Sequence, residues 1–197
     1  MHGWVMTLLA LRLKRCGFHT VTFSYPSMSN SLSQNAHLLS DFVADIAASH
    51  LHFIGHSLGG LLIMQMLSEF PDTRTRRIIL AGSPCNMSYA ANKLVKSKLT
   101  RHILGRSILQ LLEQKTPECP GWCEAGTIAG CKSFGVGRLL GGLPKPNDGV
   151  ITVEETKMLG TCDQIVLNVS HAGMLVSARV AYQVCMFLKH GKFFHNP

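Results

Sequence analysis

Residues 51–60, LHFIGHSLGG, decide the fold. A short apolar run, residues 51–54, precedes a G-x-S-x-G motif, and a helical pattern follows the motif over residues 58–70 until Pro71. A serine placed between a buried strand and a helix is typical of a nucleophile elbow, a sharp turn that exposes the serine hydroxyl. The motif consists of Gly55, His56, Ser57, Leu58 and Gly59.

The flanking glycines give this turn its space. Without side chains at Gly55 and Gly59, the strand and the helix can pass close to each other. The N-terminus of the helix then lies behind Ser57 and favours negative charge, so we expect the Leu58 N–H to stabilise an oxyanion. A glycine-rich turn with an incidental serine is the alternative, but the strand and helix on either side favour a nucleophile.

Helical and strand patterns alternate along the rest of the chain. Gly17 follows a basic helix end and Pro26 ends a β-branched and aromatic run, so both mark element boundaries. The alternation predicts an α/β fold, a mostly parallel sheet with helices on both faces. Helices are expected over residues 6–16, 30–49, 58–70 and 172–188, and strands over residues 19–25, 51–54, 77–81, 127–129 and 164–169.

A nucleophilic serine needs a general base, for which histidine is the usual choice. His171 directly follows the strand expected over residues 164–169, so it would lie at the carboxyl edge of the sheet, beside the elbow. The other candidates lie before the later strands or at the end of the last helix. We expect His171 to be the base, with a capping or core histidine as the alternative. The histidines after Ser57 are His102, His171, His190 and His195.

The base in turn needs an orienting acid between the serine and the histidine. Asp148 stands in the turn sequence PKPNDGV, and the spacing to His171 leaves room for a helix and a strand. A plain Asn-Asp-Gly turn is the competing interpretation. Glu154 and Glu155, in the helix expected between Asp148 and the next strand, are the other candidate acids.

A single domain is expected over residues 1–197, because this length suits one core. Residues 84–123 show no clear strand and are basic and amphipathic, so we interpret them as a helical insertion over the carboxyl edge of the sheet. The apolar residues of this insertion fit a lid over an acyl pocket and also ordinary packing of a cap helix.

The composition narrows the classes of function. The net charge is +8, but the basic residues are scattered and accompany no nucleic-acid motif, so we expect no nucleic-acid partner. A solvated basic face explains the charge, with attraction to an anionic membrane or substrate as the alternative. The seven cysteines, including Cys119, Cys123 and Cys131, match neither a disulfide framework nor a zinc pattern, so free thiols and no metal are expected.

The N-terminal apolar run is too short to span a bilayer, which takes about 18 residues. Residues 5–11 are followed at once by Arg12, Lys14 and Arg15, the reverse of the order in an export signal. We therefore expect a cytoplasmic protein without a membrane anchor.

With these motifs the chain resembles the α/β-hydrolase superfamily, in particular bacterial lipase-like and esterase-like proteins. The resemblance implies Ser57, Asp148 and His171 as a catalytic triad. It also implies strands before the first helix, which this chain lacks, and an oxyanion donor after a His-Gly dipeptide, here near Gly3 or Trp4. The matching pieces are FSYPS at residues 23–27, FIGHSLGG at 53–60, AGSP at 81–84, PNDGVITVEET at 146–156 and SHAGM at 170–174.

The expected activity is hydrolysis of a carboxylic ester, of lipid type or short-chain, through an acyl-enzyme on Ser57 and without a cofactor. Two other functions stay open: a non-catalytic or truncated hydrolase fold that binds a ligand, and an acyltransferase or thioesterase that uses the same residues. The oligomeric state does not follow from the sequence.

Overall fold

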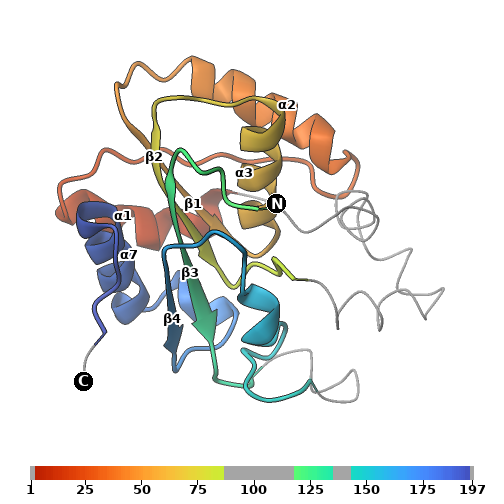
Figure 1. Cartoon of the computed structure of the whole chain (residues 1–197), viewed down its shortest axis with the longest axis vertical. Coiled ribbons are helices and arrows are strands. Elements are labelled where there is room, and N and C mark those ends of the chain that lie inside the picture. The colour runs from red at the N-terminus through yellow and green to blue at the C-terminus, as the bar shows by residue number, and fades with distance from the viewer. Residues whose placement is uncertain (1–2, 87–117, 135–142, 196–197) are drawn as a thin grey trace.

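The computed structural model describes residues 3–86, 118–134 and 143–195. Within these residues, four strands form one parallel sheet in the order β1-β2-β3-β4 (Figure 1). Each strand therefore pairs with the next one along the chain. The strands are β1 (Leu51–His56), β2 (Thr75–Ala81), β3 (Glu124–Gly130) and β4 (Asp163–Leu167).

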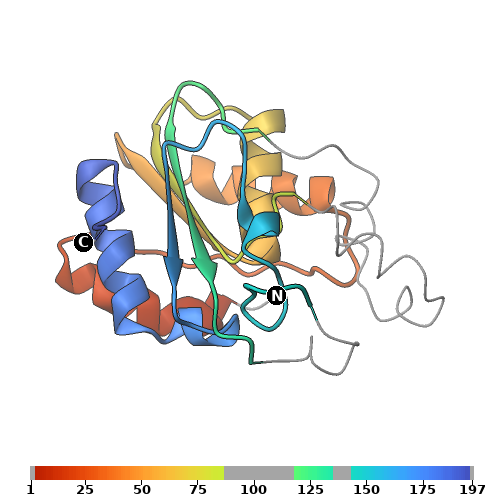
Figure 2. The same ribbon diagram turned by 60° about the horizontal axis from the view of Figure 1, so that its bottom comes forward.

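Helices cover both faces of the sheet, as the alternating sequence pattern predicted (Figure 2). Alternate residues of β2 feed the two cores: Ile78 and Leu80 face one, and Ile79 and Ala81 face the other. Helices α2 and α3 contribute to the first core, and α1 and α7 to the second. The helices are α1 (Thr7–Arg15), α2 (Leu32–Ala44), α3 (Leu58–Glu69) and α7 (Ala178–His190).

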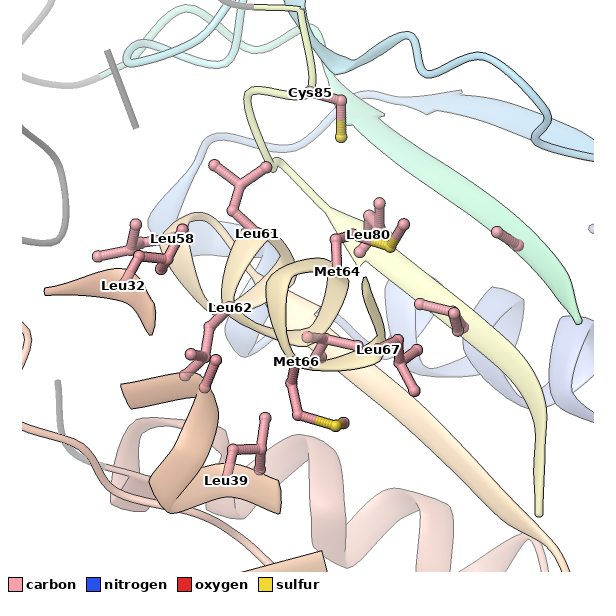
Figure 3. Close-up of a cluster of buried hydrophobic side chains, with 14 of the residues drawn as sticks. Leu32, Leu39, Leu58, Leu61, Leu62, Met64, Met66, Leu67, Leu80 and Cys85 are labelled. Atoms are coloured by element: carbon pink, nitrogen blue, oxygen red, sulfur yellow. The ribbon is translucent and has the colours of Figure 1, made fainter. Parts of the chain in front are cut away.

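The helix after the elbow, α3, is packed between α2 and the sheet. Its residues Leu62 and Met66 point toward Leu39 of α2, whereas Met64 and Leu67 point toward the strands (Figure 3). This explains why the sequence of α3 is apolar almost all round rather than on one stripe. Burial on both sides holds the start of the helix, and with it the elbow, firmly against the sheet.

Serine caps set the starts of two helices. The Ser31 hydroxyl accepts from the Gln34 N–H, and the Gln34 side chain accepts from the Ser31 N–H, so α2 begins at Leu32 and is shorter than predicted. The helix predicted over residues 172–188 is divided into a 3-10 helix, Ala172–Leu175, and α7, because Ser177 caps a new start by accepting from the Val180 N–H.

The strand predicted over residues 19–25 is wrong, because the structure shows no strand there. In the described residues β1 is the edge strand of the sheet, and residues 19–25 do not join it as a further strand. Their aromatic side chains are explained by packing instead. Tyr25 is buried against the α2–α3 core, and the rings of Phe23 and Phe42 lie 5.2 Å apart.

The helix expected around Glu154 and Glu155 is reduced to a 3-10 turn, Glu154–Thr156. The insertion expected over residues 84–123 falls largely on residues 87–117, which lie outside the described residues. The helices of the described ranges are all too short or too polar to cross a bilayer.

Candidate active site

Ser57 sits in the strained turn that the G-x-S-x-G motif predicts. Its backbone has φ 54° and ψ −127°, and it is the only described residue other than glycine with a positive φ. Such a conformation costs about 1–3 kcal/mol and persists only where its surroundings enforce it. Here the Ser57 N–H donates to the Ala81 carbonyl at 3.0 Å, which ties the turn to the end of β2.

Close packing explains Gly55 and Gly60, whereas the prediction for Gly59 is wrong, because a Cβ there would meet only the Tyr25 hydroxyl at 3.9 Å. A Cβ on Gly55 would lie 2.3 Å from the Gly60 Cα, so strand β1 and helix α3 touch without intervening side chains. A Cβ on Gly60 would lie 2.1 Å from the Ser83 hydroxyl oxygen. The elbow is thus enforced sterically from both neighbouring strands, β1 and β2.

Asp148 and His171 meet at the carboxyl edge of the sheet. The Nδ1 atom of His171 lies 2.7 Å from Asp148 Oδ2, and the His171 N–H donates to the Asp148 carbonyl at 2.9 Å. Asp148 is 1% exposed, and its Oδ1 accepts from the N–H groups of Val150 and Ile151 at 2.9 and 2.8 Å. A carboxylate held by these donors keeps the proton of the ring on Nδ1 and leaves a lone pair on Nε2.

Two glycines that the sequence analysis did not single out allow this approach. Gly82, just after β2, has φ 57°, and a Cβ there would lie 3.2 Å from His171 Nδ1 and 3.3 Å from Asp148 Oδ2. A Cβ on Gly130, at the end of β3, would lie 2.8 Å from the Asp148 Cβ. The signal in the sequence is their position, because each glycine stands at the carboxyl end of a strand and the two strands are neighbours.

His56 is a second histidine in the site. Its Nε2–H donates to the His171 carbonyl at 3.0 Å, and the two rings lie 4.5 Å apart. Burial, reinforced by the neighbouring His171, lowers the pKa of His56 to about 4. His56 therefore stays neutral near pH 7, and its donating nitrogen is occupied. It was overlooked because the search for a base began after Ser57.

Ser57 and His171 are linked through His56, which precedes Ser57 in the chain and contacts His171. In the described residues, no hydrogen bond joins the Ser57 hydroxyl to the His171 ring. Such bonds are commonly long before a substrate is bound and shorten in the reactive complex.

Comparison with known proteins identifies the family of the chain. A model of the alpha/beta hydrolase family matches residues 1–122. The chain belongs to this family. The matched segment includes Ser57 but ends before Asp148 and His171, so the family match supports the elbow, whereas the acid and the base rest on the contacts described above.

Solved structures share the fold at low sequence identity. A mature lipase from Bacillus licheniformis has a TM-score of 0.64 and 16% identity, with 85% of this chain and 76% of that chain covered. A methylesterase from Arabidopsis has a TM-score of 0.60 and 14% identity, covering 96% and 93% of the two chains. Polyneuridine aldehyde esterase has a TM-score of 0.63 and 11% identity, covering 96% and 95%. No curated protein sequence matches the chain.

The predicted oxyanion donors differ in availability. Leu58 is the first residue of α3, and N–H groups in the first turn of a helix lack an intrahelical acceptor. The Gly3 N–H instead donates to the Ser24 hydroxyl at 2.8 Å, so in this structure it is not free to bind an oxyanion. Trp4 is 72% exposed and lies in the 3-10 helix Gly3–Met6.

The carboxylates of the other two candidate acids bind partners other than His171. Glu154 is exposed and pairs with Lys157 at 2.7 Å. Glu155 is buried, and its carboxylate accepts from the N–H and hydroxyl of Thr152 at 3.0 and 2.9 Å. Of the three acids, the structure brings Asp148 to the His171 ring. No group of three metal-binding side chains occurs in the ranges that the structure describes.

Proposed function

We propose that this member of the alpha/beta hydrolase family hydrolyses carboxylic esters through a Ser57–His171–Asp148 triad. The observation that carries the proposal is the His171–Asp148 pair beside the elbow. Its 2.7 Å hydrogen bond leaves the other ring nitrogen of His171 available to take a proton. The esterases and the lipase among the structural neighbours share the fold of the chain at 11–16% identity.

In the first half of the proposed cycle, His171 Nε2 removes the Ser57 proton as the Ser57 oxygen attacks the ester carbonyl carbon. Negative charge moves to the carbonyl oxygen, where the Leu58 N–H and the positive end of α3 stabilise it. When the tetrahedral intermediate collapses, the bond to the alcohol breaks and His171 returns its proton to the departing oxygen. The product is an acyl-enzyme on Ser57.

In the second half, water replaces the alcohol. His171 removes a proton from the water as its oxygen attacks the acyl carbon, and the acid is released with the proton returned to Ser57. Asp148 keeps the Nδ1–H tautomer of His171 and stabilises the ring when it carries two protons. Trp4 remains a predicted second oxyanion donor, to be tested beside Leu58.

The test is labelling with a fluorophosphonate, which reacts only with an activated serine. We expect the wild type to be labelled at one site and Ser57→Ala not to be labelled. Ser68→Ala is the matched control, because Ser68 lies on the same helix α3 and is exposed. Labelling that survives in Ser57→Ala would assign the nucleophile to another serine and overturn the proposed triad. Folded wild-type protein that is not labelled would overturn the proposal in favour of a ligand-binding role.

The substrate is examined next with 4-nitrophenyl esters from acetate to palmitate and with a thioester. We expect turnover of the oxygen esters and, as the lipid-type prediction requires, a rise in kcat/KM with acyl length. A rate that depends on an added alcohol, with a new ester as product, would instead identify an acyltransferase.

A further inference from the structure

We propose that His56 is a positioning residue for the base, holding the His171 loop in the conformation that aims Nε2 at Ser57; this rests on the proposed function. His56 is not itself a candidate base. Its Nε2–H is already committed to the His171 carbonyl, and burial lowers its pKa to about 4, which makes it a poor proton acceptor at neutral pH.

The first argument is geometric. The backbone of His171 is held from two sides: its N–H donates to the Asp148 carbonyl at 2.9 Å, and its carbonyl accepts from His56 Nε2 at 3.0 Å. Its ring is likewise held by Asp148 at Nδ1 and by packing against the His56 ring, whose centre lies 4.5 Å away with the planes tilted by 51°. Without His56, the His171 carbonyl would keep only the longer bond from the Met174 N–H, at 3.4 Å.

The second argument concerns the chain position of His56. It is the last residue of β1 and directly precedes Ser57, so it belongs to the rigid elbow. The loop with His171 follows β4, at the far side of the sheet order from β1. The contact from His56 is therefore a short link between the part of the chain that carries the nucleophile and the part that carries the base.

The third argument is electrostatic. His171 becomes positively charged during each half-reaction, and a second charged imidazole 4.5 Å away would oppose that charge. Because burial keeps His56 neutral, it restrains His171 without this repulsion. The charged groups that face His56 are His171, when protonated, and Asp148.

A matched set of variants separates donor position from ring packing. The amide nitrogen of His56→Gln reaches about as far as Nε2, whereas that of His56→Asn reaches only as far as Nδ1. His56→Phe keeps a ring but has no donor. We expect His56→Gln to retain kcat, and His56→Asn and His56→Phe to lose about tenfold in kcat at unchanged KM, the size of one lost buried hydrogen bond.

A second readout does not need turnover. The proton between His171 Nδ1 and Asp148 Oδ2 should give a far-downfield NMR resonance that is present in wild type and His56→Gln but broadened in His56→Asn and His56→Phe. Asp148→Asn should remove this resonance, which confirms its assignment. Equal kcat and an unchanged resonance in all folded variants would overturn the proposal. If wild type is not labelled by fluorophosphonate, the proposed function fails, and the resonance alone decides whether His56 positions His171.

Discussion

The turn that carries Ser57 and the loops that carry Asp148 and His171 meet at the same edge of the sheet, but different forces hold them. The turn is fixed by backbone contact: Gly55 and Gly60 are so close that a single Cβ would overlap the chain. The loops are fixed by hydrogen bonds to a buried carboxylate. Changes to the glycines of the turn should therefore affect folding, and changes in the loops should affect chemistry.

The largest effect is expected in the loops, from Asp148→Asn. The amide would favour the wrong tautomer of His171 without changing shape, so kcat/KM should fall by about 10⁴-fold while the protein stays folded. Ester hydrolysis measures the loss of activity, and circular dichroism measures whether the protein stays folded. The control is Glu154→Gln, because Glu154 is exposed and forms an ion pair with Lys157. Its kcat/KM should stay within about twofold of wild type. A folded Asp148→Asn protein with wild-type activity would remove Asp148 from the triad.

The turn should respond in stability instead. Gly55→Ala places a Cβ 2.3 Å from the Gly60 Cα, so we expect a loss of about 3 kcal/mol or more in the free energy of unfolding, measured in urea. Gly60→Ala mainly meets the Ser83 side chain, which can be removed.

Ser83→Gly should therefore restore about half of the stability lost in Gly60→Ala, and none of that lost in Gly55→Ala. The removal itself costs no hydrogen bond, because the buried Ser83 hydroxyl has no partner among the described residues. Equal rescue of both variants would contradict the idea that backbone, rather than a side chain, limits Gly55.

Lowering the pH should reduce the stability of the protein through protonation of His56, which joins the two regions. The pKa of His56 is about 4 when folded and 6.5 at its ordinary value, so the unfolded chain binds more protons between these pH values. Stability is full above about pH 6.5 and falls toward pH 4. At pH 5 the loss from His56 is about 2 kcal/mol. Urea unfolding of wild type at pH 7.5 and 5 should show it, and His56→Gln should show a smaller loss. Equal losses would contradict the assignment.

The same contrast explains what could be predicted from sequence. The elbow could be recognised because its motif places Gly55 at a backbone contact that no side chain allows. The pattern of elements around the motif predicted the sheet and its covered faces. Chain order and strand position reduced the candidates for the base to His171. Three candidate acids remained, Asp148 among them, because hydrogen bonds between loops leave no periodic pattern in the sequence.

Errors arose where tertiary contacts decide local structure. Residues 19–25 have strand propensity, yet in the structure they form no strand, and Phe23 and Tyr25 pack against the core of α2 and α3. His56 escaped notice because its role depends on a carbonyl contributed from a distant loop. Pairings of this kind cannot be read from either segment alone.

The smallest effect should come from Gly82, where the two regions touch. Gly82→Ala would impose a side chain at φ 57° and place its Cβ 3.2–3.3 Å from the bonded atoms of His171 and Asp148. Gly17→Ala is the matched control, since Gly17 has φ 93° but nothing within 4 Å of its Cβ position. Both should lose about 1 kcal/mol of stability from the backbone strain.

Only Gly82→Ala should also lose activity, by about tenfold in kcat/KM, because the added methyl group displaces one partner of the His171–Asp148 hydrogen bond. Ester kinetics and urea unfolding on both variants separate the two effects. If both lose activity in proportion to stability, strain alone accounts for Gly82. If Gly82→Ala loses activity beyond Gly17→Ala, the end of β2 takes part in setting the distance between acid and base.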